Sequence, residues 1–167
     1  MQRGRQRKLF AFLLAASLLT GFISCESIDC TVDNVVTLNV GFYSSDDGSA
    51  FLLTDTLTVT AAGTDSVLYN RGIGIATVSL PMSYWQEADT LLLHFANPDE
   101  THDVTLIVGK QNTPHFESPD CPTTMFHEIT GTTLVDPTGY IDSVGVTKNS
   151  VRYGSQENIK IYLHPAD

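Results

Sequence analysis

The chain has 167 residues, and its 19 acidic and 9 basic side chains give a formal net charge of -10 at pH 7. This length suits one domain with a sizeable core, and a hydrophobic content of 42% excludes a wholly disordered chain. The acidity argues against a nucleic-acid-binding protein, because a phosphate backbone repels an acidic surface.

The first 24 residues have the layout of a secretory signal peptide. Four basic residues, Arg3, Arg5, Arg7 and Lys8, precede an apolar stretch at residues 9–24. That stretch is shorter than the roughly 20 apolar residues that a transmembrane helix requires. We therefore favour a signal peptide over a transmembrane anchor.

The residues around Cys25 resemble the bacterial lipobox, in which a cysteine receives a diacylglycerol and becomes the new N-terminus. Ser24 and Ile23 fit that motif, whereas Phe22 stands where leucine is usual. We therefore expect Cys25 to carry acyl chains such as palmitate, with an ordinary cleavage site as the alternative. Several chains attach a protein stably, since each buried methylene contributes about 0.8 kcal/mol.

Cleavage before Cys25 changes the charge of the protein. It removes four basic and no acidic residues, so the mature chain carries 5 minus 19, or -14. A surface this acidic is not attracted to anionic lipid. We therefore expect the covalent lipid, and not the surface charge, to hold the protein at the membrane.

The three cysteines fit an exported protein if one of them is acylated. With Cys25 lipidated, Cys30 and Cys121 can form a disulfide in an oxidising compartment, and two free thiols are the alternative. Five extended residues span at most about 17 Å, so a bonded Cys30 would keep the domain close to the bilayer. No acidic tract follows Cys25, which favours the periplasmic face of the outer membrane over the cell surface.

Alternation of apolar and polar residues predicts eight or nine β-strands, separated by turn sequences rich in Asp, Asn, Gly and Pro. We expect an all-β antiparallel sandwich of the immunoglobulin-like or jelly-roll kind, with a small β-barrel as the alternative. The expected divisions are a signal peptide at 1–24, a lipidated tether at 25–33 and one domain at 34–167. Residues 111–121 are expected to form a long loop. The predicted strands lie near residues 36–42, 56–61, 67–69, 76–80, 91–95, 104–108, 125–129, 141–146 and 159–163.

No catalytic constellation is visible, since the chain has neither a GxSxG elbow nor an SxxK motif with its partners. Its five histidines lack metal-ligand spacing, so we interpret them as surface or core residues. Calcium is a weak candidate ligand at two groups of turn acids. These groups are Asp46 with Asp47, and Asp99, Glu100 and Asp103 around His102.

Tyr84 and Trp85 are candidate binding aromatics, with Tyr43, Tyr69 and Phe51 as further members of a stacking platform. The favoured interpretation is that Trp85 instead closes the end of the sandwich, where its indole would be buried.

Short motifs distributed over the mature chain resemble an uncharacterised family of small Bacteroidota lipoproteins, known only as a domain of unknown function. The motifs are Cys25, Cys30, Phe42-Tyr43, the segment from Thr64 to Tyr69, Leu80-Pro81, Cys121 and the segment from Asn158 to Tyr162. The resemblance implies an outer-membrane setting and makes an outer-membrane β-barrel a candidate partner. It assigns no catalytic residues.

We therefore expect a lipid-anchored, non-enzymatic accessory module that binds an envelope or β-barrel protein. A surface glycan-binding or adhesive lipoprotein is the first alternative, and a periplasmic hydrolase is the second. We expect no nucleic-acid partner.

Overall fold

A computed structural model describes residues 36–64, 66–119 and 121–164. The predicted signal peptide, Cys25 and Cys30 lie outside these residues. The described part contains ten strands and no helix, which confirms the all-β class. Its strands are β1 (Thr37–Ser44), β2 (Thr56–Ala61), β3 (Val67–Gly72), β4 (Thr77–Pro81), β5 (Ala88–Ala96), β6 (Thr101–His115), β7 (Thr124–Val135), β8 (Ile141–Val146), β9 (Ser150–Val151) and β10 (Ile159–Leu163).

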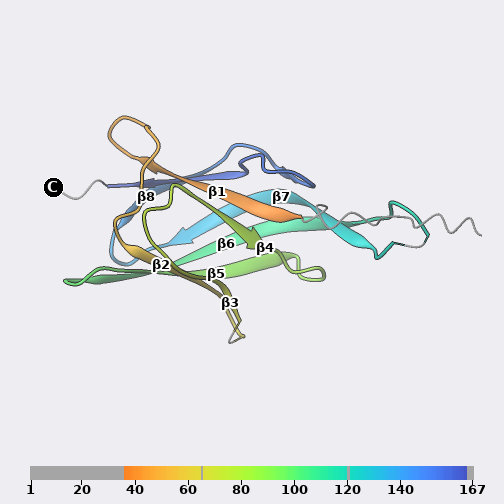
Figure 1. The fold of residues 1–167 in the computed structure, drawn as a ribbon, viewed down its shortest axis with the longest axis horizontal. Helices are drawn as coiled ribbons and strands as arrows, with labels where there is room; N and C mark the ends of the chain where they lie inside the picture. Colours follow the sequence, from red (N-terminus) through yellow and green to blue (C-terminus); the bar gives the residue numbers. More distant parts are fainter. Residues whose placement is uncertain (1–35, 65, 120, 165–167) are drawn as a thin grey trace, which may run out of the picture. The chain divides into compact units, whose positions relative to one another are not determined.

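The strands form two sheets that pack face to face (Figure 1). The smaller sheet has the order β4-β1-β10-β8, and the larger has the order β3-β2-β5-β6-β7-β9. All pairings between the strands are antiparallel except that of β1 with β10, which is parallel. The predicted sandwich is therefore confirmed, and the two separate sheets exclude one closed barrel.

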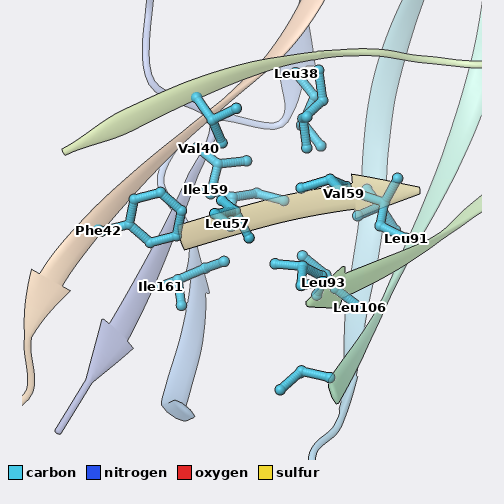
Figure 2. Packing of buried hydrophobic residues seen from close by; sticks show 14 of the residues in the cluster. Leu38, Val40, Phe42, Leu57, Val59, Leu91, Leu93, Leu106, Ile159 and Ile161 are labelled. Carbon is cyan, nitrogen blue, oxygen red and sulfur yellow. The ribbon is translucent and has the colours of Figure 1, made fainter. Parts of the chain in front are cut away.

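The core lies between the sheets, because alternate residues of each strand point inward. Figure 2 shows apolar side chains of β1 and β10 facing those of β2, β5 and β6. Burying each such side chain stabilises the fold by about 1.5–3 kcal/mol. Fully buried examples are Leu38, Phe42, Leu57, Phe95, Leu106, Ile159 and Ile161.

Strands β6 and β7 form a hairpin that is longer than the sequence predicts. The expected loop at 111–121 is wrong over residues 111–115, which belong to β6 and pair with β7. The pairing of β5 with β6 ends at Ala88 and Gly109, so the hairpin extends beyond its neighbour there. The β6 part of this extension lacks apolar alternation because residues 111–115 are exposed or only partly buried, whereas β7 opposite them keeps Met125 buried. Strand β9 was not predicted, and it contains only two residues.

The described sandwich has two ends, which we name after one residue each. The Trp85 end contains the start of β1, the β4–β5 loop at residues 82–87 and the tip of the β6–β7 hairpin at residues 116–119 and 121–123 (Figure 1). The Asp55 end contains the β5–β6 turn and the β7–β8 loop. No helix in the described ranges is long and apolar enough to cross a membrane.

Candidate functional site

The β4–β5 loop presents the most exposed large hydrophobic side chain of the described residues. Trp85 is 84% exposed, and Tyr84 beside it is 48% exposed. The favoured interpretation of Trp85 as a buried plug is therefore wrong. Met82 continues the inward alternation of Val78 and Leu80 and is itself buried. The inward position at this end is thus filled before the chain reaches Trp85.

An ion pair beneath the loop fixes its first half. Lys110 Nζ lies 3.1 Å from Asp89 Oδ2, with the lysine side chain fully buried and the aspartate nearly so. The ammonium also donates to the carbonyl oxygen of Ser83. The backbone N–H and the hydroxyl of Ser83 donate to the Asp89 carboxylate. Strands β5 and β6 therefore hold the residue that directly precedes the exposed aromatics.

The second half of the loop is held by hydrogen bonds to β6. Lys110 N donates to Glu87 O at 2.7 Å, and Asn112 Nδ2 donates to Gln86 O at 2.8 Å. The amide oxygen of Asn112 accepts a hydrogen bond from Nδ1 of the buried His127, at 2.7 Å. Trp85 thus stands on a loop attached on both sides, which lowers the conformational entropy lost when the indole is bound.

The environment of this cluster fixes its protonation. Burial lowers the pKa of Lys110, and the hydrogen bond and charge of Asp89 oppose that shift. Burial, together with the charge of Lys110, lowers the pKa of His127 to about 4. His127 is therefore neutral at pH 7, and its hydrogen lies on Nδ1, since the oxygen of Asn112 only accepts.

The cluster places a serine hydroxyl beside a lysine, which is a pairing used for nucleophilic catalysis. Ser83 Oγ lies 3.0 Å from Lys110 Nζ. However, the ammonium is paired with Asp89 and has no lone pair to accept the hydroxyl proton, while that proton is donated to the carboxylate. In this arrangement the three residues brace the loop.

Sequence reasoning missed these buried polar residues, although the strand pattern contains them. Asp89 precedes the inward-facing Leu91 by two residues, and Lys110 follows the inward-facing Val108 by two. His127 lies midway between the buried Met125 and Ile129 on β7. Extending the alternation by one step would have placed Asp89 and Lys110 inside, and His127 already lies at an alternate position of the strand predicted at 125–129.

A cavity of about 460 Å³ lies beside the loop, facing the β2–β3 turn. Its size suits a small ligand. Trp85 is not among its lining residues, so the indole and the cavity are separate features. Residues that line it include Thr64, Ser66, Leu68, Met82, Gln86 and Thr90.

The structure does not assemble the larger aromatic platform. Tyr43 lies on β1, and its ring contacts that of Tyr162 on the smaller sheet. Its hydroxyl donates to Glu157, which raises the pKa of the phenol. Phe51 packs against the core, and Tyr69 lies on β3. Only Tyr84 and Trp85, of the five aromatics proposed, are neighbours on the β4–β5 loop.

The histidines and turn acids fill structural positions. Partly buried His102 stacks on Tyr140 with ring centroids 4.2 Å apart, and His115 stacks on Phe126 at the same separation. Exposed His94 pairs with Asp103 at 2.7 Å. Within the described ranges no group of three His, Cys, Asp or Glu residues is placed to hold a metal ion, so the calcium candidates gain no support.

The Asp46–Asp47 turn illustrates why acids gather there without a metal. The backbone N–H and hydroxyl of Ser49 both donate to Asp47 Oδ1, at 2.9 and 2.8 Å. These hydrogen bonds lower the pKa of Asp47, because they stabilise its charged form. The carboxylate therefore closes its own turn. His164 lies near this turn, with Nδ1 3.2 Å from Ser45 Oγ.

The outer face of the larger sheet has an uncharged stripe that crosses five strands. Each member is paired with the next one across neighbouring strands, and the three aliphatic members have large side chains that are exposed. The stripe consists of Val67, Thr60, Leu92, Thr105 and Val135. A second uncharged row, Thr90, Ile107 and Thr133, lies beside it. In so acidic a chain, two adjacent rows without charge form a distinct surface.

The start of β1 and the hairpin tip belong to the same end of the sandwich. Val36 pairs with Tyr153, whose ring contacts Phe126 at 5.0 Å and His115 at 5.8 Å on the two hairpin strands. Cys121 lies at the tip and has a bonding partner. The predicted partner of Cys121, Cys30, lies outside the described residues.

Comparison with known proteins gives one match. No curated protein and no solved structure matches the chain. A model described as "Family of unknown function (DUF6452)" matches residues 56–163, which span β2 to β10 and more than half of the sequence. The expectation of a domain of unknown function is thereby confirmed. The chain belongs to the family of unknown function DUF6452.

Proposed function

We propose that the mature protein is an outer-membrane lipoprotein that serves as a non-enzymatic binding module for an envelope protein, with a β-barrel as the first candidate. The signal-peptide layout, the lipobox-like residues before Cys25 and the resemblance to Bacteroidota lipoproteins support the membrane setting. The uncharged stripe centred on Leu92 is the observation that supports the binding role.

A disulfide between Cys30 and Cys121 is part of this proposal. Five residues lie between Cys30 and Val36, and the six steps of chain between their Cα atoms reach at most about 20 Å. Because Val36 and the hairpin strands share contacts with Tyr153, the tip lies in the region that Cys30 can explore. Such a bond would close a loop of about 90 residues and stabilise the fold by roughly 4–5 kcal/mol in the chain-entropy model.

The position of the stripe suits a partner that lies beside the protein in the membrane. The strands of the larger sheet run between the Trp85 end and the Asp55 end, so the sheet face is lateral to the end from which the chain leads back to Cys25. The stripe spans about 19 Å over four strand spacings. Mature chains with a net charge of -14 repel one another and other acidic surfaces. Because the two rows on this face carry no charge, a partner can contact the face without that repulsion.

Site-specific crosslinking in intact cells tests the proposal. A photo-crosslinking amino acid at Leu92 is expected to capture a membrane-embedded envelope protein, and the same amino acid at Thr77, on the outer face of the other sheet, is not. The substitution Leu92→Glu should abolish co-purification of that protein, because a carboxylate would be desolvated at the contact. Capture from Thr77 alone, or capture of no envelope protein, would refute the assignment of this face.

The anchoring half of the proposal has its own measurement. Mass spectrometry of the native N-terminus should find a diacylglycerol-modified Cys25, and the Cys25→Ser variant should be released from the membrane fraction. An unmodified N-terminus at another residue would refute lipidation. For the disulfide, alkylation under denaturing and non-reducing conditions should label neither Cys30 nor Cys121.

A glycan-binding surface lipoprotein is the second candidate, favoured by the exposure and fixed support of Trp85. Indole faces stack on sugars, and Trp85 is the sole tryptophan, so its fluorescence reports binding directly. Soluble glycans that change this fluorescence, together with cleavage of the protein by protease added to intact cells, would favour this candidate over the first.

A further inference from the structure

Exposed aromatic side chains gather at the Trp85 end. Besides Tyr84 and Trp85, Phe116 at the hairpin tip is 68% exposed. The two segments are linked through Asn112, which donates to Gln86 of the loop and lies four residues before Phe116 on β6. Large aromatic surfaces left in water on two neighbouring segments indicate a contact surface.

This end is also the one from which the chain leads toward the proposed lipid. Ten residues lie between Cys25 and Val36, and the eleven steps of chain between their Cα atoms reach at most about 36–40 Å. One strand such as β5, with nine residues, is about 30 Å long. The segment from Cys25 to Val36 would therefore have to be almost fully extended for the Asp55 end to face the bilayer, whereas the Trp85 end can face it without that extension.

The chemistry of these side chains suits the headgroup region of a bilayer. Aromatic residues, tryptophan above all, concentrate at membrane–water interfaces, where an apolar ring and a polar edge are both accommodated. Of the five basic residues of the mature chain, Lys110 is fully buried, whereas Arg152 lies over the Phe126 ring of the hairpin and lines a pocket together with Lys148. Because the mature chain carries a net charge of -14, we expect apolar burial, and not attraction to anionic headgroups, to dominate a membrane contact at this end.

We propose that Trp85 and Phe116 insert into the headgroup region of the membrane that holds the lipid anchor. This inference rests on the lipid anchor of the proposed function. The lipid supplies the affinity, and the aromatic contacts fix the orientation of the sandwich. The brace of Lys110, Asp89 and Ser83 holds the β4–β5 loop in place, so little conformational entropy is lost on insertion. The stripe centred on Leu92 then faces along the membrane.

The single tryptophan makes the contact measurable in the whole mature protein. Lipidated protein is reconstituted into phosphatidylcholine vesicles that contain lipids brominated near the headgroup end of the acyl chains. Bromine quenches indole fluorescence at short range, so most of the Trp85 emission should be lost and the remainder should resist quenching by aqueous acrylamide. Added salt should leave this result unchanged, because apolar burial is not screened.

A matched variant moves the reporter to the opposite end. Ile73 is an exposed residue that lines a cavity with Asn97 of the β5–β6 turn. The double variant Trp85→Phe and Ile73→Trp should keep its emission in brominated vesicles and lose it to acrylamide. The Phe116→Ser variant, which keeps Trp85 as reporter, should show weaker bromine quenching than the parent, since one of the two inserted rings is absent.

Mass spectrometry of the same sample separates the two possible failures. If Cys25 carries lipid but Trp85 is quenched by acrylamide and not by bromine, the membrane contact is refuted and the anchor stands. Equal bromine quenching of Trp85 and of Trp at position 73 would also refute it. If Cys25 carries no lipid, the proposed function is refuted, and the inference that rests on it is refuted as well.

Discussion

Both ends of the sandwich bury an aspartate that fixes loops, but the two carboxylates have different partners. At the Trp85 end, Asp89 pairs with the buried ammonium of Lys110. At the Asp55 end, Asp55 accepts hydrogen bonds from neutral groups, the Tyr140 hydroxyl at 2.9 Å and Asn97 Nδ2 at 3.2 Å. The first arrangement fixes one loop with a full charge pair, and the second joins two loops with neutral donors.

This difference in partners determines how much stability each end loses when a residue is substituted or the pH changes. Removing one member of a buried ion pair leaves an uncompensated charge, which costs several kcal/mol. Removing a neutral donor from a carboxylate leaves its other hydrogen bonds in place and costs less. The Trp85 end should therefore be the more sensitive of the two, both to substitution and to pH.

The largest expected effect is that of Lys110→Met. The substitution leaves the Asp89 carboxylate buried without its counter-ion and should lower the free energy of unfolding by about 3–5 kcal/mol. Urea unfolding at neutral pH measures it. The control Lys160→Met removes a partly exposed lysine 3.9 Å from Glu157 and should cost less than about 1 kcal/mol. Equal losses for the two variants would contradict the comparison, and adding Asp89→Leu to Lys110→Met should restore much of the loss.

The pH dependence of stability should be dominated by His127 between pH 6.5 and 4. In the folded protein its pKa is lowered to about 4, whereas the unfolded chain binds the proton near 6.5. The free energy of unfolding should thus be greatest above pH 6.5 and fall as the pH decreases to 4, by at most about 3 kcal/mol. The His127→Asn variant should show a flatter profile in this range, while His164→Asn, at an exposed position, should follow the parent. A parallel slope for parent and His127→Asn would exclude His127 as the cause.

A smaller effect is expected at the Asp55 end. Tyr140→Phe removes one donor from the buried Asp55 carboxylate and should cost about 1.5–3 kcal/mol, as is usual for hydrogen bonds to charged groups. Its matched control is Tyr84→Phe, which removes a hydroxyl from a half-exposed ring. Thermal and urea unfolding of the two variants measure the difference. A loss equal to that of Lys110→Met would show that the two ends do not differ in the manner proposed.

The smallest effect on folding is expected from Trp85→Ser. Since the indole is 84% exposed, its removal should change the free energy of unfolding by no more than about 0.5 kcal/mol. The same unfolding experiment measures it. A loss above 2 kcal/mol would show that Trp85 packs on the domain and would weaken its assignment as a contact residue.

The sequence predicted the fold class and most strand positions, because half-buried strands produce alternation that survives without tertiary information. Residues 111–115 of β6 escaped prediction because they extend beyond the pairing with β5 and are exposed or only partly buried, whereas the β7 residues opposite them keep buried Met125 and belong to the strand predicted at 125–129. The candidate aromatics were identified by residue type, but their exposure was misjudged. Whether Met82 or Trp85 fills the inward position depends on where the chain leaves the sheet.

The sequence by itself determined an all-β chain with a predicted export signal, since periodicity and segment order are local properties. Only the tertiary structure decided which residues of distant strands meet. It joined Ser83, Asp89 and Lys110 beneath one loop, and it aligned Leu92 with register partners on four other strands. These contacts depend on strand order and register, which are set by packing of the whole core and not by any single segment.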